Sequence, residues 1–448
     1  MRKRIVVLLI NPWITDFAAY NYWSEPLGLL YIASILNNCG AEIHYIDCLT
    51  SREEQNPRPR KNGCSKYRRT IINKPACLGF VPRYYARYGM SEEEFARRLE
   101  LLPVPDVVLV TSLMTYWYPG VFRVIELVKK LYSQGIPVIL GGIYARLCPA
   151  HARENAKANL VWTEDDIPGL LKAIEGLTGK ELYIRLNLNA FSDYPLPMHE
   201  LQEGRKFFSI LTAQGCPFKC SYCASSILAK KASRRPLASI VTEISRYSAL
   251  LNTSNVAFYD DALLIDSESH MIPLFETISE KEPGLSLHLP NGVHASYITR
   301  RIASLMQKAG VRTIRIGLET SDEALQKKIG EKITNQEYAR AVAHLREAGY
   351  TREEIGTYVM AGLPGQTPES VENTIRFIYD CGGAPHLSYF SPIPDTGIWN
   401  EVLRSTPFPI EKEPLFQNNT VFILGNRDFT QETISFLKNM ALELRKKP

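Results

Sequence analysis

The sequence predicts an α/β protein with a doubly wound, Rossmann-like N-terminal domain, a partial (β/α)6 barrel of the TIM type and a short helical C-terminal tail. Two observations predict this class. Short apolar segments alternate with segments of helical periodicity along most of the 448 residues, which is typical of parallel sheets with crossover helices. Several apolar segments are continuous, as in strands that helices cover on both faces. We expect domains at residues 1–180, 200–395 and 396–448, with an insertion at 51–90.

The N-terminal domain opens on a predicted buried strand. Its apolar run ends at Asn11-Pro12-Trp13 without a small-residue cleavage site, so a signal peptide is the weaker interpretation. No apolar run reaches the roughly 18 residues that span a bilayer. His44 falls on an apolar strand and is expected to be a core histidine. We expect strands over residues 5–10, 42–47, 106–111 and 136–140, and helices over 26–36 and 121–131.

A basic stretch lies inside this domain. Residues 58–87 contain nine Lys or Arg and no Asp or Glu, with Tyr67, Phe80, Tyr84 and Tyr85 interleaved. This composition is typical of a segment that binds an anionic substrate or RNA. It also describes a solvated surface excursion whose aromatic residues hold it to the domain. We favour the excursion, because one short stretch is not a basic face.

Six predicted strands alternate with helices in the second domain. They are residues 207–212, 256–259, 285–289, 313–317, 356–360 and 387–390. Helix-start signals support this count: Thr334 and Glu337 form a capping box, and Thr367 precedes Pro368. Active groups of such barrels lie at the carboxyl ends of the strands. An amphipathic helix over residues 431–446 is expected to pack on the barrel or between domains.

A ten-residue run after the first barrel strand, residues 215–224, contains Cys216, Cys220 and Cys223. Three thiolates at this spacing can bind three irons of a cubane cluster and leave the fourth iron open. A closed structural metal site uses four ligands. The sequence therefore predicts a metal centre with an open position, where chemistry takes place.

Two other uses of these cysteines have less support. Zinc needs a fourth ligand, and the nearest histidines, His199 and His270, and the next cysteine, Cys381, are far along the chain. A disulfide framework is weaker still, because the chain has nine cysteines, an odd number, and no signal peptide.

The pattern Cys-x3-Cys-x2-Cys, with Tyr222 just before the last cysteine, resembles the signature of the radical S-adenosylmethionine (SAM) superfamily. The resemblance implies that the three thiolates bind a [4Fe-4S] cluster and that the amino and carboxylate groups of SAM chelate the open iron. Electron transfer into the sulfonium then releases a 5′-deoxyadenosyl radical. Tyr222 would lie against the adenine of SAM.

The same resemblance assigns polar residues after the second and third barrel strands to SAM. One of Asp260 and Asp261 would receive the ammonium of SAM, where the superfamily usually has a Gly-Gly-Glu-like segment. Helix N-capping is the alternative role of this pair. Asn291, which with His288 is expected to end the third strand, would bond the ribose, although Asn-Gly is also a plain turn signal.

Later strands supply the remaining predicted SAM contacts. Residues 311–320 resemble the superfamily's fourth-strand segment, in which Glu319 would bond the ribose or amino group and Gly317 would allow close approach. Arg315 is expected to pair with a carboxylate inside the barrel. Met360 belongs to a segment that resembles the fifth strand and would lie along the adenine.

A second resemblance lies in the N-terminal domain. Thr111-Ser112-Leu113, followed after 27 residues by Gly141-Gly142, is similar to the Ser/Thr-x-Leu and Gly-Gly elements of cobalamin-binding domains. The resemblance implies that the hydroxyl residue meets the nucleotide tail of cobalamin and that the glycines let this tail pass close to the backbone. The order of the two domains resembles the B12-binding radical SAM enzymes.

One departure from the cobalamin pattern concerns the cobalt ligand. Residues 11–20, after the first strand, contain no histidine, whereas cobalamin domains of the methionine synthase type carry Asp-x-His-x-x-Gly there. Many B12-binding radical SAM enzymes also lack it. Thr115 and Tyr116, in the loop 114–118, are expected to cover that face of the corrin. Ordinary aromatic packing is the alternative for this loop.

The resemblances imply SAM cleavage at the cluster, hydrogen abstraction from an unactivated carbon and cobalamin-dependent C-methylation. Alternatives are radical oxidation or rearrangement without methyl transfer, a non-catalytic corrin- or cluster-binding sensor, and an RNA modifier that uses the basic stretch. We expect a small-molecule or peptide substrate and an external electron donor of the flavodoxin or ferredoxin type, and no membrane partner. A nucleic-acid partner has less support and stays open as the RNA-modifier alternative. We expect a soluble, cytoplasmic protein; the net charge of +5 is mild.

Overall fold

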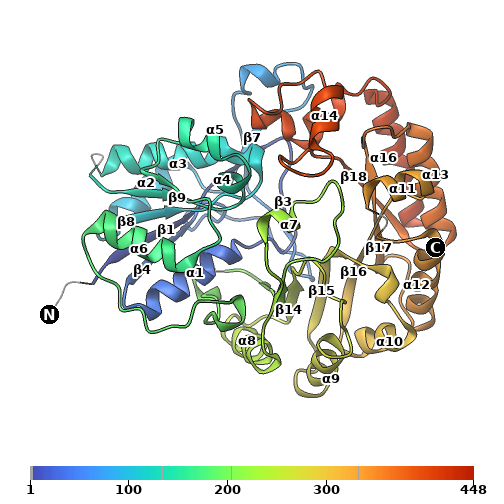
Figure 1. Ribbon diagram of the computed structural model, residues 1–448, viewed down its shortest axis with the longest axis horizontal. Coiled ribbons are helices and arrows are strands. Elements are labelled where there is room, and N and C mark those ends of the chain that lie inside the picture. The colour runs from blue at the N-terminus through green and yellow to red at the C-terminus, as the bar shows by residue number, and fades with distance from the viewer. Residues whose placement is uncertain (1–3, 133–134, 203, 331, 448) are drawn as a thin grey trace. The chain divides into compact units, whose positions relative to one another are not determined.

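The computed structural model describes residues 4–132, 135–202, 204–330 and 332–447. The chain forms two compact units, drawn as ribbons in Figure 1. One comprises Met1–Arg205 and Lys412–Phe416, and the other Lys206–Glu411 and Gln417–Pro448. Each is built on a parallel sheet, in agreement with the predicted α/β class. Among the helices of the described residues, none is both long and apolar enough to cross a membrane.

The sheet of the first unit has five parallel strands in the order β10-β9-β8-β1-β4. The strands are β1 (Val6–Asn11), β4 (Glu42–Asp47), β8 (Val107–Val110), β9 (Val138–Leu140) and β10 (Leu160–Val161). The chain leaves β1 for β4 on one side and later adds β8, β9 and β10 on the other. This is the doubly wound topology, and ligands of such sheets bind where the order reverses, here between β1 and β8.

Helices cover both faces of this sheet. They include α1 (Leu27–Asn38), α2 (Glu92–Glu100), α3 (Tyr118–Leu131) and α6 (Ile167–Thr178). Val7 and Leu9 of β1 are buried in one core with residues of α1 and α6. Leu8 and Ile10, which point the other way, are buried in a second core with residues of α2 and α3. The continuous apolar runs in the sequence follow from this burial on both sides.

The basic stretch folds onto the loop that follows β1. Antiparallel pairing joins β2 (Ile14–Asp16), β7 (Ala86–Tyr88) and β6 (Arg69–Ile71), and β3 (Tyr20–Asn21) pairs with β5 (Ser65–Lys66). Tyr67 and Tyr85 are buried, and the Tyr85 hydroxyl donates to the Thr15 carbonyl oxygen at 3.1 Å. Phe80 and Tyr84 are exposed. Two of the four aromatic residues therefore hold the stretch to the unit, as the favoured interpretation expects.

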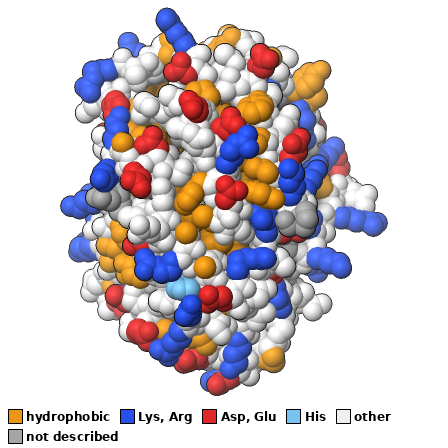
Figure 2. Space-filling model, turned by 90° about the vertical axis from the view of Figure 1, so that its right-hand side faces the viewer, with side chains coloured by type: hydrophobic (Ala, Val, Ile, Leu, Met, Phe, Trp, Pro, Cys, Tyr) orange, Lys and Arg blue, Asp and Glu red, His pale blue; other side chains and the backbone are white. Residues whose placement is uncertain are grey.

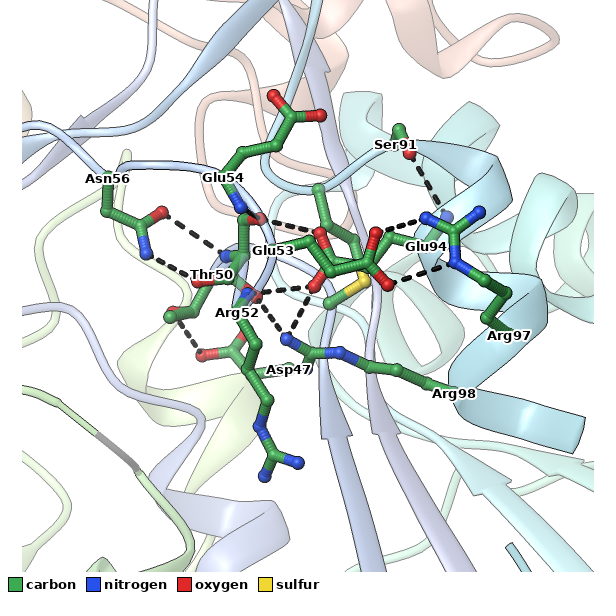
Figure 3. A network of polar contacts seen from close by, with 12 residues as sticks. Asp47, Thr50, Arg52, Glu53, Glu54, Asn56, Ser91, Glu94, Arg97 and Arg98 are labelled. Atoms are coloured by element: carbon green, nitrogen blue, oxygen red, sulfur yellow. Dashed lines mark hydrogen bonds and ion pairs between the residues drawn. The ribbon is translucent and has the colours of Figure 1, made fainter. Parts of the chain in front are cut away.

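A polar network around Glu94 fixes the start of the insertion to α2 (Figure 3). The buried Glu94 carboxylate accepts from the Ser51 hydroxyl at 2.6 Å and from the Arg52 backbone N–H at 2.8 Å. Arg98, one turn along α2, donates to the same carboxylate at 2.6 Å. Arg97 pairs with Glu53 beside it. Because Glu94 is buried, these donors satisfy a charge that would otherwise be costly.

The second unit has a six-stranded parallel sheet in the order β11-β14-β15-β16-β17-β18. The strands are β11 (Phe208–Ile210), β14 (Asn255–Phe258), β15 (Ser286–Val293), β16 (Val311–Glu319), β17 (Ile355–Ala361) and β18 (Ala384–Tyr389). The helices between them include α8 (Leu237–Leu250), α9 (Met271–Lys281), α10 (Arg300–Lys308), α11 (Glu323–Ile329), α12 (Asn335–Glu347) and α13 (Pro368–Asp380). Strand order follows chain order, as expected for a partial (β/α)6 barrel.

The C-terminal helix α16 (Gln431–Lys446) contacts β18 and α13 of this unit. Figure 2 shows the side of the molecule that lies at the right of Figure 1, where α16 and α13 are drawn. Basic and acidic side chains are interspersed on that side, with hydrophobic ones between them.

Two predictions about histidines and strand ends are wrong. β15 continues to Val293, so His288 and Asn291 lie within the strand and not at its end. His288 is buried and bonded to Thr313 and Asn255. His44 is not a core histidine: its side chain is 22% exposed and pairs with Glu42 at 2.8 Å. Both errors arise because strand length and the identity of edge strands depend on tertiary pairing.

Candidate functional site

The cysteine loop, residues 215–224, connects β12 (Ala213–Gln214) to α7 (Ser225–Leu228) in the second unit. Cys216, Cys220 and Cys223 are free thiols and are half-buried. Because the loop follows the first strand of the parallel sheet, it lies at the carboxyl end of that strand. Barrels of this type carry their active groups at this end.

Two backbone hydrogen bonds hold the middle of the loop. The Ser221 N–H donates to the Ile329 carbonyl at the end of α11, at 2.9 Å, and the Ser221 carbonyl accepts from the Ile398 N–H at 2.8 Å. Gly330 has a φ of +126°, and a Cβ there would lie 2.8 Å from the Cα of Cys220. The α11 terminus therefore packs directly against the cysteine loop and leaves no space for a side chain.

The three thiols suit a cluster better than a single ion. Among the described residues, no three His, Cys, Asp or Glu side chains converge on a point where they could hold one metal ion. Zinc would require such convergence of four ligands. In a cubane each thiolate binds a different iron, so the three sulfurs surround the cluster at a wider spacing than the ligands of one ion. Three free thiols in one half-buried loop are the ligand set that a [4Fe-4S] cluster with one open iron uses.

Burial raises the pKa of the Cys216 and Cys220 thiols. The charge of Asp261 adds to the rise at Cys216, and the ammonium of Lys332 opposes the rise at Cys220. Both thiols are therefore protonated at neutral pH in the ligand-free protein. They must release these protons when they bind iron, because the thiolate is the metal ligand.

A closed triangle of polar groups lies beside the loop. Lys332 Nζ donates to Glu319 Oε1 at 2.9 Å and to the Tyr222 hydroxyl at 3.0 Å, and that hydroxyl donates to Glu319 Oε1 at 3.2 Å. Burial and the neighbouring Glu319 raise the pKa of Tyr222. Burial alone would lower the pKa of Lys332, but the charge of Glu319 outweighs it and the pKa is raised. Lys332 is thus an ammonium, and Tyr222 a neutral hydroxyl.

The predicted pair Asp260 and Asp261 divides into two roles. Asp260 is buried, and its carboxylate accepts from the Thr212 hydroxyl at 2.6 Å and from the Ala213 N–H at 2.7 Å. Burial raises its pKa to about 6 although these bonds favour the charged form. Asp260 therefore ties the end of β14 to the entry of the cysteine loop. Asp261 is exposed, and its charge acts on Cys216.

Asn291 and Met360 form hydrogen bonds with other residues of the second unit. The Asn291 side-chain amide donates to the Tyr259 carbonyl at 2.8 Å and to the Asp260 carbonyl at 3.3 Å. The half-buried Met360 has its carbonyl bound by Gln366 at 2.8 Å. The Asn291 amide nitrogen thus stabilises the end of β14. The roles of both residues toward SAM stay predictions.

Gly317 does permit close approach, and the group that approaches is Lys332. A Cβ at Gly317 would lie 2.8 Å from Lys332 Nζ and 3.0 Å from Glu319 Oε1. Sequence reasoning missed Lys332, which is 110 residues from Tyr222 and belongs to no recognisable motif. It also missed His294, whose ring stacks on Phe218 of the cysteine loop with centroids 4.3 Å apart. Burial lowers the pKa of His294 to about 4, so its ring is neutral.

The first unit brings Ser112 and Gly141-Gly142 together at the carboxyl edge of its sheet, next to the switch point between β1 and β8. The buried Ser112 hydroxyl donates to the Gly141 carbonyl at 2.6 Å, and the Ser112 carbonyl accepts from the Ile143 N–H at 2.7 Å. Gly142 has a φ of +91°, and a Cβ there would lie 2.3 Å from the Ser112 carbonyl oxygen. A Cβ at Gly141 would meet nothing within 4 Å. The two segments form one cradle at the carboxyl ends of β8 and β9.

The loop after β8 packs against the loop after β1. Thr115 and Tyr116 are buried, whereas Leu113 is half-buried. The Trp117 indole N–H donates to Asp16 at 2.7 Å. The Tyr116 ring lies inside the unit, which favours the packing alternative for that residue. A role of these residues toward a corrin stays a prediction.

Residues 210–378 match the family model of the radical SAM superfamily. This part of the chain is a radical SAM domain. The match covers the cysteine loop and four of the six barrel strands, β14 to β17, which confirms the predicted resemblance for this part of the chain. A radical SAM domain implies SAM and a [4Fe-4S] cluster as cofactors.

Relatives and solved structures extend the comparison to nearly the whole chain. An uncharacterised methyltransferase of Pyrococcus horikoshii is 24% identical over 67% of this chain and 70% of its own. The cytidylyl-2-hydroxyethylphosphonate methyltransferase of Streptomyces wedmorensis is 22% identical over 90% of this chain and 82% of its own.

Among solved structures, the radical SAM methyltransferase TsrM of Kitasatospora setae, with cobalamin and a [4Fe-4S] cluster bound, superposes with a TM-score of 0.67 at 17% identity. The match covers 98% of this chain and 91% of TsrM. The fold around the radical SAM domain is therefore shared with an enzyme of the group that the sequence resembles.

Proposed function

We propose that this chain is a cobalamin-dependent radical SAM enzyme that methylates an unactivated carbon of its substrate. One observation carries the proposal: the radical SAM domain holds three free thiols in one half-buried loop at the carboxyl end of its first strand. The methyltransferase names of the relatives and the cobalamin and cluster bound in TsrM support the cofactor set and the methyl transfer.

Cys216, Cys220 and Cys223 hold the cluster in this proposal. When bound, the reduced cluster and SAM supply a radical that removes hydrogen from carbon, and methylcobalamin supplies the methyl group. The chain's own residues bind and orient. Tyr222 and Glu319 face the SAM site from the loop and from β16, and Asp261 is the carboxylate left to receive the ammonium of SAM, since Asp260 is bound to the backbone.

The first unit holds the corrin in this proposal. Gly141 offers an open surface to the nucleotide tail, while Gly142 and Ser112 shape the cradle beneath it. The loop after β1 contains no histidine, so we expect no histidine ligand from that loop on cobalt. The Trp117–Asp16 bond holds the two neighbouring loops in place.

The partners follow from the chemistry. We expect an external one-electron donor of the flavodoxin or ferredoxin type and a small-molecule or peptide substrate. An oxygen-labile cluster fits the reducing cytoplasm, and so does the odd number of cysteines, nine.

The first test is anaerobic purification with quantitation of iron, sulfide and corrin, followed by reduction in the presence of SAM. We expect close to four irons, one corrin and release of 5′-deoxyadenosine. Cys216→Ala is expected to lose the cluster and SAM cleavage, and retained cleavage in this variant contradicts the proposal.

With candidate substrates, one methylated product for each deoxyadenosine supports C-methylation, whereas deoxyadenosine without methylation indicates radical oxidation or rearrangement. A protein that binds corrin or cluster but releases no deoxyadenosine is a sensor.

A further inference from the structure

The Lys332 ammonium occupies space that is free because Gly317 has no side chain. The ammonium lies above Gly317, where any Cβ would be only 2.8 Å away, and it pairs with Glu319 at 2.9 Å. The two side chains are 15% and 9% exposed. Glu319 reaches this position with a φ of +67°, a conformation that residues other than glycine rarely adopt.

Stability does not explain a charged pair at this place. The desolvation of two ions offsets most of their attraction, so a neutral hydrogen-bonded pair would hold the Tyr222 hydroxyl equally well. Strained backbone that the surrounding structure maintains is concentrated at functional sites. The Lys332–Glu319 pair therefore indicates that the charges of these side chains have a function beyond stability.

The charge lies next to the predicted cluster. Lys332 and Tyr222 line one small cavity together with Cys220. Tyr222 lies between Cys220 and Cys223 in the chain. Its hydroxyl is hydrogen-bonded to both Lys332 and Glu319. Reduction by an external one-electron donor adds one negative charge to the cluster, so a nearby cation favours the reduced state and a nearby carboxylate opposes it.

We propose that Lys332 is a positioning residue that also raises the reduction potential of the cluster, with Glu319 as a counter-ion that limits the rise. The inference rests on the proposed function only in requiring that Cys216, Cys220 and Cys223 bind the cluster. Lys332 touches Tyr222 and Glu319, and through them it also holds the cysteine loop against the end of β16.

The test is a redox titration of the reconstituted full-length protein without SAM, followed by electron paramagnetic resonance of the reduced cluster. Glu319→Gln removes the carboxylate charge and keeps the shape and an acceptor for both hydrogen bonds. We expect the ratio of reduced to oxidised cluster at a given potential to rise about tenfold, a shift of about +59 mV for one electron. The double variant E319Q/K332M then removes the ammonium, and we expect the ratio to fall back by a similar factor. E319Q/K332R keeps the positive charge and is expected to stay near E319Q.

Removing the carboxylate should raise the reduction potential, and removing the ammonium should then lower it. These opposite shifts distinguish an electrostatic role from a structural one, because a loosened loop would shift the potential in the same direction in E319Q and in E319Q/K332M. Equal potentials in wild type and E319Q, or in E319Q and E319Q/K332M, overturn the inference. If the double variant binds no cluster, the comparison of wild type with E319Q still decides. A wild-type protein without a cluster signal contradicts the proposed function instead, so the two failures are separable.

Discussion

At Gly142, a single hydrogen atom in place of a side chain decides whether the cradle of the first unit can form. The φ is +91°, and a Cβ would lie 2.3 Å from the Ser112 carbonyl oxygen, so alanine has no room there. We expect Gly142→Ala to destabilise the protein by about 1–3 kcal/mol and to weaken corrin binding. Thermal unfolding and corrin titration measure both. Gly141→Ala is the matched control for the unfolding measurement, because a Cβ there meets no protein atom within 4 Å; an equal loss of stability in both variants contradicts this prediction.

Asp260 gives the protein a pH dependence of known sign. Its pKa is raised to about 6 in the folded protein, above the value of 3.8 in an unfolded chain. The folded state therefore binds the proton more tightly, and this contribution to stability is present below pH 4 and is lost as the pH rises through 6. We expect it to amount to on the order of 2–3 kcal/mol, since each unit of pKa corresponds to about 1.4 kcal/mol.

The measurement is chemical unfolding of the ligand-free wild type and of Asp260→Asn between pH 4 and pH 8. Asparagine keeps an acceptor for Thr212 and Ala213 but does not titrate. The difference in unfolding free energy between the two proteins should change across this range in favour of the variant as the pH rises. A constant difference would show that the pKa of Asp260 is not raised in the folded protein.

At the scale of elements, the end of α11 supports the cysteine loop. Gly330→Ala places a Cβ 2.8 Å from the Cα of Cys220 and must displace the loop. We expect its iron and sulfide content after reconstitution to fall at least threefold. Gly349 also has a positive φ, +95°, but a Cβ there meets nothing within 4 Å. Gly349→Ala therefore carries similar backbone strain without the clash, and it should reconstitute like wild type. Full cluster content in Gly330→Ala would rule out this support.

The elements themselves could largely be predicted from the sequence. The six barrel strands and the Thr334–Glu337 capping box occur where expected, because apolar runs and capping residues act locally. Strand ends could not be predicted: β15 extends four residues beyond its predicted end at residue 289, to Val293, because it pairs with β16 across an irregular register. Such pairing depends on a neighbour that is distant in sequence.

At the scale of the whole molecule, cofactor binding should couple to folding. A ligand that binds only the folded chain stabilises it in proportion to the logarithm of its concentration over its Kd. We expect the cluster-loaded wild type to unfold several degrees above the same protein after anaerobic chelation of iron. Cys216→Ala, treated in the same way, should show no such difference. An unchanged Tm after iron removal would mean that the cluster does not bind the folded chain in preference to the unfolded one.

The sequence by itself determined the α/β class, the order of the two sheets and the cysteine trio, because periodicity and short motifs are local properties of the chain. It also indicated Tyr222 and Glu319 through their resemblance to known segments. Only the tertiary structure revealed Lys332 between them, turned Asp260 toward the backbone of Thr212 and Ala213, and brought Ser112 against Gly142. Those contacts join residues about 13 to 110 positions apart, and the packing of strands and loops, which no local pattern encodes, decides which of them meet.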